Sequence, residues 1–149
     1  MKQILLLALT TTLLMSCKTY NSSLSEDKHS FELLYQSEYG GKDKQTFLVA
    51  ESVADLQKIV QNPMFDETLQ QKLQSVDFQK HVLVLLHAGQ KNTGGYSISV
   101  ESIKIDKGIT TVTVKETGPE PGTQVTMALS NPFAIVAVPK NEKIIFSEL

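Results

Sequence analysis

Two short apolar runs constrain the fold of this chain more than any other feature. They are VLVLLH at residues 82–87 and PFAIVAVP at residues 132–139. Neither run alternates with polar residues as a strand with one solvated face would, and each has the length of a strand. Both are therefore expected to be strands that are buried on both faces.

Two further strands are expected at residues 31–35 and 45–50, on either side of a polar turn that contains Gly40-Gly41. The pair looks like a β-hairpin. A last strand is predicted at residues 143–146. We predict a single domain over residues 29–149 of the α+β class, with a mostly antiparallel sheet and one or two helices packed on it.

A second hairpin is expected around Asp106-Lys107-Gly108, which is a favourable turn sequence. A turn centred on Lys107 places Val100 opposite Val114 and Ser102 opposite Val112. Ile103, Ile105 and Ile109, which are nearer the turn, do not fit the same alternation of apolar and polar positions. This change of phase predicts a bulge or twist near Glu101-Ser102.

Helical spacing of apolar residues predicts a helix over residues 53–61 with one apolar stripe. The stripe consists of Val53, Leu56, Ile59 and Val60. Ser52 is placed to cap the N-terminus of this helix, with Asp55 three residues later as in a capping box. Residues 66–74 are expected to form a second short helix, with Leu69 and Leu73 on its apolar side.

The N-terminus has the pattern of a bacterial lipoprotein signal. Lys2 supplies a positive charge, an apolar stretch follows, and Leu14-Met15-Ser16-Cys17 matches a lipobox. The apolar stretch is shorter than the ~20 residues that span a bilayer, so we expect residues 1–16 to be a cleaved signal peptide. Cys17, the only cysteine, would then carry a diacylglycerol on its thiol and a further acyl chain, such as palmitate, on its amine.

Residues 17–28 are expected to be a lipidated flexible tether, because they are polar and have no apolar period. Lys18, rather than an aspartate, follows Cys17 directly. This arrangement resembles lipoproteins that are sorted to the outer membrane. The localisation we expect is therefore the bacterial cell envelope, at the outer membrane.

Composition argues against several kinds of partner. All 14 cationic residues are lysines, and removal of Lys2 leaves 13 against 16 acidic residues, a net charge of −3. The absence of arginine argues against recognition of nucleic acid or phosphate. The negative sign argues against a polybasic membrane patch, so membrane binding is expected from the acyl chains alone.

Three segments rich in glycine, proline and threonine are expected to meet at one end of the sheet. They are residues 91–96, 117–122 and 130–133, which we call the rim. The hairpin register places Tyr96 opposite Gly118, and the strand after residue 131 starts at the same edge.

A functional interpretation makes the rim a surface for recognition of another protein. Glycine allows close approach of another backbone, and proline lowers the entropy cost of binding. The candidate partner-binding residues are Thr93, Gly94, Gly95, Tyr96, Pro119, Pro121 and Gly122. The alternative is structural: the glycines form a bulged turn, Tyr96 and Phe133 fill the core, and the prolines end strands. For Phe133 we favour this alternative.

Catalysis finds little support in the sequence. No GxSxG, HExxH, P-loop or paired-carboxylate motif is present, so we expect a protein that is not an enzyme and has no cofactor. His81 and His87 would share one face of a strand near Asp77, but zinc needs at least three convergent ligands. We therefore expect partly exposed histidines at the strand ends and no metal site.

The second half of the chain resembles the C-terminal domain of the PrcB family over residues 76–140. The residues that carry the resemblance are Asp77-Phe78, Gly89, Thr93-Gly94-Gly95-Tyr96, Pro119, Pro121-Gly122, Val125-Thr126, Asn131-Pro132-Phe133 and Val138-Pro139-Lys140. Members of this family are often lipoproteins. The founding member is a subunit of the dentilisin protease complex, where it assists formation and stability of the protease. The resemblance implies a protein-binding module that acts beside an exported protease.

Residues 92–96 (NTGGY) also resemble the NPTTGY loop of chagasin-like inhibitors of cysteine proteases. The chain departs from that pattern because it lacks the proline after Asn92, an RPW loop and any tryptophan.

Three functions follow from the sequence. The leading one is a non-enzymatic, lipid-anchored module that binds an exported protein, such as a protease or another envelope protein, and assists its assembly or stability. The second is a protease inhibitor that uses loops 91–96 and 117–122. The third, a periplasmic ligand-binding domain, would require a deep polar pocket around His81, His87 and Asp77.

Overall fold

A computed structural model describes residues 31–60 and 65–149 of the chain. The expected signal peptide at residues 1–16, Cys17 and the expected tether at residues 17–28 lie outside the described residues. Within the described residues, no helix has the length and apolar character needed to cross a bilayer.

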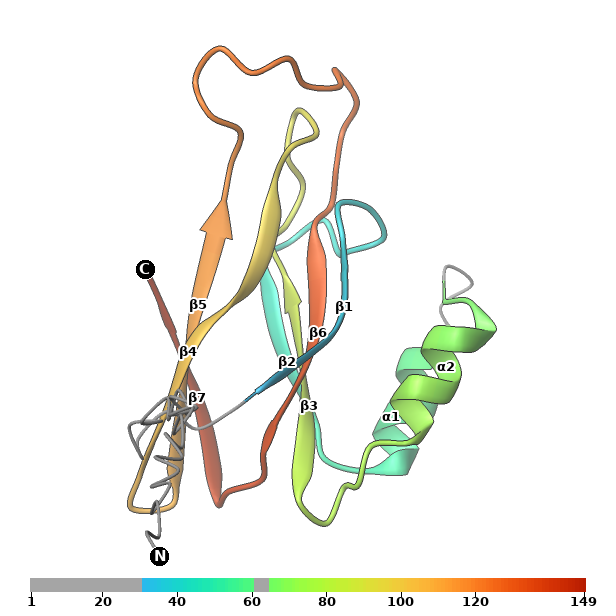
Figure 1. Cartoon of the computed structure of the whole chain (residues 1–149), viewed down its shortest axis with the longest axis vertical. Coiled ribbons are helices and arrows are strands. Elements are labelled where there is room, and N and C mark those ends of the chain that lie inside the picture. Colours follow the sequence, from blue (N-terminus) through green and yellow to red (C-terminus); the bar gives the residue numbers. More distant parts are fainter. Residues whose placement is uncertain (1–30, 61–64) are drawn as a thin grey trace, which may run out of the picture.

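The described residues form two β-sheets and two helices (Figure 1). The elements are β1 (Glu32–Ser37), β2 (Thr46–Ala50), α1 (Val53–Val60), α2 (Glu67–Gln74), β3 (His81–His87), β4 (Ser97–Asp106), β5 (Ile109–Thr117), β6 (Phe133–Pro139) and β7 (Lys143–Glu148). One sheet has the strand order β1-β6-β3-β2 and is antiparallel throughout. The other has the order β4-β5-β7, in which β5 and β7 run parallel. The mostly β character with two helices agrees with the prediction, but there are two sheets rather than one.

The four-stranded sheet is the middle layer of the molecule. Figure 1 shows the helices on one side of it and the three-stranded sheet on the other. On β3, Val82, Val84 and Leu86 face the core between the two sheets. Leu83 and Leu85 of the same strand face a second core beneath the helices. Because both faces of β3 and β6 are covered by apolar layers, their sequences are continuous apolar runs, as predicted.

Both predicted helices are present, and each begins at a capping side chain. The Ser52 hydroxyl accepts a hydrogen bond from the Asp55 N–H at 3.2 Å and donates to the Asp55 carboxylate at 2.7 Å. The Asp66 carboxylate accepts from the Leu69 N–H at 2.7 Å at the start of α2. Among the helix side chains that the structure describes, Leu56, Leu69 and Leu73 are buried.

The predicted apolar stripe on α1 is only partly right. Leu56 is buried, but the Val53 side chain is 58% exposed. It lies in the first turn of the helix, where the chain has just left the end of β2. The side chains of Ile59 and Val60 lie outside the described residues.

The predicted hairpin between the first two strands is wrong. β1 pairs with β6, whereas β2 pairs with β3. The two most buried strands, β3 and β6, pair with each other in the centre of the sheet. Each central strand then has one free edge, and a less buried strand, β1 or β2, occupies each of these edges.

The β4–β5 hairpin has a two-residue loop, Lys107-Gly108, with φ angles of 48° and 77°. Two positive φ angles in succession are typical of a type I′ turn. The turn places Ile103 opposite Val112, so the predicted pairing of Ser102 with Val112 is wrong. The predicted bulge is confirmed between Val100 and Ser102, and beyond it Val100 lies opposite Val114 as expected.

A candidate binding site at the rim

The three segments of the rim lie together in the structure. Lys91 and Ser130 exchange two backbone hydrogen bonds, of 2.8 and 3.1 Å. The Gly94 N–H donates to the Thr126 carbonyl at 3.0 Å. These bonds join the loop before β4 to the long loop between β5 and β6, as the sequence predicted from connectivity.

The rim lies at the end of the fold opposite the point where the described chain begins. Ser37, at the end of β1, pairs with Phe133, whereas Glu32, at its start, pairs with Ala137. Phe31 is therefore close to the end that carries the Lys107-Gly108 turn. Figure 1 shows the long loop after β5 at the far end of the molecule from that turn.

Thr93 and Gly94 hold the rim together from within. The Thr93 carbonyl accepts a hydrogen bond from the Ser130 hydroxyl at 2.6 Å. Gly94 is buried, and a Cβ at this position would collide with the Thr126 hydroxyl. The absence of a side chain at Gly94 therefore allows the loop of Thr126 to approach closely enough for the hydrogen bond to form.

Position 95 favours glycine for two reasons. Its φ angle is +84°, which strains a residue that has a side chain. A Cβ there would also lie 3.2 Å from both Pro119 and Val125. The Gly95 N–H donates to the Glu38 carboxylate at 3.4 Å, so the loop after β1 also contacts the rim.

Tyr96 lies half-buried against the start of the long loop. A Cβ at Gly118 would be only 2.9 Å from the Tyr96 ring, so a glycine accommodates the ring there. The Lys91 ammonium lies 5.7 Å from the ring centroid, a cation–π distance. Lys91 also forms an ion pair with Glu116 at 2.6 Å. Its charge is therefore already paired within the protein.

Pro121, Gly122 and Gly95 are the exposed members of the candidate set, and Gly95 is in contact with Pro119, Val125 and Glu38. A Cβ added at Gly122 would meet no atom within 4 Å, although its φ angle is +86°. Pro121 and Gly122 occupy a turn that is closed by a 3.0 Å hydrogen bond from the Thr123 N–H to the Glu120 carbonyl. They are the members of the predicted set whose position is most open to a partner.

Phe133, the last residue of the rim, lies in a cluster of aromatic side chains. Phe133 is buried, as predicted, and its ring stacks on His87 with centroids 5.7 Å apart. Tyr35 packs against the same phenyl ring at 5.3 Å. The ring atom Nδ1 of His87 accepts a hydrogen bond from the Lys42 N–H at 3.3 Å.

The expectation that His87 would be partly exposed is wrong, since the residue is only 7% exposed. Its ring lies between Phe133, on which it stacks, and the backbone of Lys42. Burial, together with the positive charge of Lys42, lowers the pKa of His87 from 6.5 to about 4. His87 is therefore neutral at physiological pH.

Sequence reasoning did not single out the most exposed apolar residues at this end. Met127 is 87% exposed and Leu129 is 56% exposed. Both lie in the loop of residues 123–129, which joins two segments of the rim. The available signal was a run of 19 residues, from Pro121 to Pro139, without a charged side chain. That run contains both this loop and the buried strand β6, so the pattern alone does not tell exposed apolar residues from buried ones.

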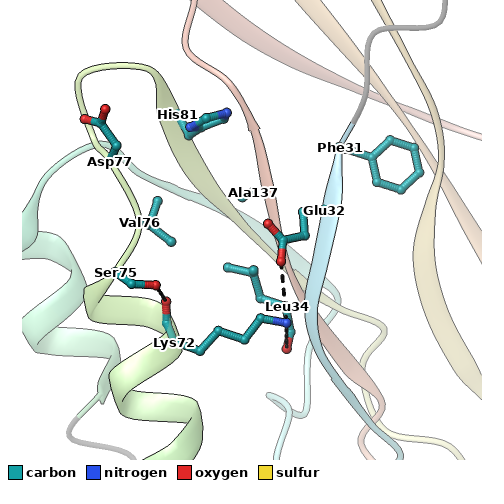
Figure 2. A pocket seen from close by; sticks show the side chains of 9 residues that line it. All are labelled: Phe31, Glu32, Leu34, Lys72, Ser75, Val76, Asp77, His81 and Ala137. Carbon is teal, nitrogen blue, oxygen red and sulfur yellow. Dashed lines mark hydrogen bonds and ion pairs between the residues drawn. The ribbon is translucent and has the colours of Figure 1, made fainter.

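A pocket of about 420 Å³ lies at the opposite end, between α2 and the sheet (Figure 2). It contains His81 but not His87. The Lys72 ammonium is 3.6 Å from the Glu32 carboxylate, so these two charges neutralise each other. In Figure 2 the Asp77 carboxylate points away from the pocket, and it accepts a 2.9 Å hydrogen bond from the Gln79 N–H. The polar groups here do not converge as a ligand site requires.

Within residues 31–60 and 65–149, no three histidine, cysteine or acidic side chains are grouped so that they could hold a metal ion.

Residues 82–139 match the family model described as PrcB C-terminal. Over this region the chain is similar to the PrcB C-terminal family. The matched region runs from β3 to the end of β6 and includes the whole rim. β1, β2, both helices and β7 lie outside it. No curated protein and no solved structure shows significant similarity to the chain.

Proposed function

We propose that this protein is a non-enzymatic module that binds another exported protein through the rim. Acyl chains on Cys17 would anchor it to the membrane of the cell envelope. The resemblance to the subunit of a protease complex makes an exported protease, or another envelope protein that needs help in assembly, the first kind of partner to seek.

The observation that carries this proposal is that loops from distant parts of the chain are fixed together at one end of the sandwich. Backbone hydrogen bonds from Lys91 and Gly94 hold the long loop, and Pro119 packs on Gly95. A surface that is already ordered loses little conformational entropy when a partner binds. Loops that rigid sheets hold in place are also where binding residues concentrate in proteins.

The position of the rim relative to the chain entry supports the same function. The described chain begins at Phe31, at the end of β1 remote from Phe133. A tether that leads to this point from a lipidated Cys17 would attach at the end opposite the rim. The rim would then be free to meet a protein beyond the membrane surface.

The test uses the acylated protein, expressed in its own membrane and recovered with its partners after mild crosslinking. Pro121→Asp places a charge on the exposed part of the rim. We expect it to reduce partner recovery by ~10-fold or more, because an unpaired charge at a contact surface must lose its water. Gln79→Asp is the matched control, since it adds the same charge in an exposed turn at the opposite end.

Equal recovery with Pro121→Asp and the wild type would contradict the role of the rim, and so would equal loss with both variants. A Cys17→Ser variant tests the anchor in the same preparation. It should leave the membrane fraction, and its N-terminus should carry no acyl group by mass spectrometry.

A further inference from the structure

Within residues 31–60 and 65–149, β2 is the edge strand with the least protection against pairing with another chain. Edge strands of natural proteins usually carry charges, a proline or a bulge that prevents such pairing. β1 and β4 each contain a bulge, and the Gln36 amide of β1 donates a 2.9 Å hydrogen bond to the Ile98 carbonyl of β4. β7 has a charged residue at each end. β2 has none of these features between Thr46 and Ala50.

The backbone groups of Phe47 and Val49 point away from the sheet. Just beyond the end of β3, the Ala88 N–H donates a 2.9 Å hydrogen bond to the Pro132 carbonyl. Hydrogen bonds alternate along an antiparallel strand, so the even-numbered residues of β3 bond to β6 and its odd-numbered residues bond to β2. The partners of these odd-numbered residues on β2 are Thr46, Leu48 and Ala50. The N–H and C=O groups of Phe47 and Val49 therefore lie on the open edge.

The side chains of β2 also leave apolar surface uncovered. Phe47 and Val49 are only partly buried at the margin of the core between the two sheets. Leu48 points to the opposite face, which it shares with Ala50 of the core beneath the helices, and it is 38% exposed. A further strand at this edge would cover apolar side chains on both faces of the sheet.

We propose that β2 pairs antiparallel with β2 of a second copy of this chain, about a two-fold axis that passes beside Leu48. Two identical edges meet in this way in a symmetric dimer. With Leu48 at the axis, the whole of β2 is paired in each copy, and Phe47 of one copy lies opposite Val49 of the other. These are the residues whose backbone groups are open, so each such pair exchanges both of its N–H···O bonds.

A second copy is the partner to expect because β2 is complementary to itself. Leu48 meets Leu48 of the other copy at a position without hydrogen bonds, where the Cα atoms of opposite residues are only about 4.5 Å apart. On the other face, Phe47 and Val49 form a pair of an aromatic and a β-branched side chain, which is a favourable combination across strands. At each end, Glu51 of one copy lies opposite the uncharged Gln45 of the other. The register therefore places no two like charges opposite each other.

β7, the other open edge on this side of the sandwich, lacks such complementarity. The Lys143 N–H donates to the Gly108 carbonyl at 3.3 Å, so the even-numbered residues of β7 face outward. Pairing of β7 with itself about Phe146 would place the Glu148 carboxylate opposite Ile144. Pairing about Ile145 would place Glu148 opposite Glu142 of the other copy. Like charges directly opposite each other are unfavourable.

This dimer goes beyond the proposed function and does not depend on it. Thr46 pairs with His87, and His87 pairs with Phe133, so β2 begins at the end of the sandwich that carries the rim. Antiparallel pairing therefore places the two rims at opposite ends of the dimer. Because the two-fold axis is perpendicular to the paired sheets, a bilayer parallel to these sheets is equally distant from both chain entries.

The experiment detects the register by disulfide formation in the native membrane that contains the full chain. Leu48→Cys places two thiols opposite each other at the axis, within the Cα separation of about 4.4–6.8 Å that a disulfide requires. Thr46→Cys is the matched control on the same strand. Residue 46 lies opposite Ala50 of the other copy, so two thiols at position 46 would be roughly 13 Å apart.

After mild oxidation, a non-reducing gel should show at least ~10-fold more covalent dimer for Leu48→Cys than for Thr46→Cys. The wild type, in which Cys17 is the only cysteine, gives the background.

A second measurement needs no added cysteine. Light scattering of the purified protein in detergent gives the dissociation constant of the dimer. Leu48→Asp places two like charges opposite each other in a contact without water, so the dissociation constant should rise by ~100-fold. Ile145→Asp is the matched control, because Ile145 is also 38% exposed and lies on the edge strand β7. It should change the dissociation constant by less than ~3-fold. Circular dichroism of both variants checks that the fold is retained.

Absence of a covalent dimer for Leu48→Cys, or equal amounts for Leu48→Cys and Thr46→Cys, would overturn the inference. A monomeric wild type would do the same, and so would a dimer that Ile145→Asp dissociates and Leu48→Asp does not. These failures are distinguishable from failure of the proposed function, because recovery of the partner with Pro121→Asp reports on the rim and not on β2.

Discussion

Acid should destabilise this domain through one buried histidine. His87 lies beneath the rim, stacked on Phe133, and its Nδ1 accepts a hydrogen bond from the Lys42 N–H. A proton on Nδ1 would remove that acceptor and place a charge in a buried site beside the ammonium of Lys42. Both effects oppose protonation, and the pKa of His87 is accordingly lowered to about 4.

The sign and the size of the effect follow from linkage. In the unfolded chain His87 takes up its proton near pH 6.5, whereas in the folded chain it does so only near pH 4. Between these values the unfolded state binds more protons, so the free energy of unfolding falls as the pH falls. At about 1.36 kcal/mol per pKa unit, the full loss has an upper bound of about 3.4 kcal/mol. Above about pH 7.5, where His87 is neutral in both states, this group contributes almost no pH dependence.

The assay is urea unfolding at about pH 7.5 and about pH 4.5. The His87→Asn variant places an amide oxygen near the position of Nδ1, so a hydrogen-bond acceptor is retained, but the amide cannot take up a proton in this pH range. We expect the wild type to lose about 2 to 3 kcal/mol more than His87→Asn between the two pH values. His81→Asn, on the same strand but outside the Phe133 stack, should keep the extra loss. Equal losses in the wild type and His87→Asn would refute the reasoning.

Two further predictions concern backbone conformation. Gly94→Ala should lower the free energy of unfolding by roughly 1–3 kcal/mol, because its Cβ overpacks against the Thr126 hydroxyl. Gly122→Ala, with open space around its Cβ, should cost only the roughly 1 kcal/mol of a positive φ angle; equal costs in urea unfolding would argue against the overpacking. Lys107→Asn should raise the free energy of unfolding by about 0.5 kcal/mol, because asparagine tolerates the φ of 48° in the Lys107-Gly108 turn. The melting temperature should rise accordingly. A lower melting temperature would show that the lysine side chain has a stabilising contact there.

Much of the secondary structure could be predicted because it depends on local pattern. The unbroken apolar runs identified β3 and β6, and Ser52 and the spacing of Leu69 and Leu73 identified the helices. The bulge near Glu101 was predictable because the apolar alternation of β4 changes phase there. The pairing of the strands could not be predicted in the same way, because it depends on contacts between distant segments. β1 and β2 are adjacent in sequence and were expected to pair, but each gains more by covering a free edge of the central β3–β6 pair.

The composition of the site could be predicted only in part. Connectivity placed Gly94, Gly95 and Pro119 together because the two strands of one hairpin end there. The burial of Gly94 could not be predicted, because it depends on Thr126, which reaches it from a loop without a regular register. The exposure of Met127 is equally hidden in the sequence, since apolar residues in a run look the same whether they face a core or solvent.

The sequence by itself determined which segments form strands and helices, and that the rim draws on three loops, because periodicity, caps and turn residues act over a few neighbours. Its lipobox also predicts an anchor at Cys17. The tertiary structure decided the strand order, the three layers, the burial of His87 and the exposure of Met127. Each of these depends on which surfaces cover one another, and burial of apolar area between distant segments has no local signature in the chain.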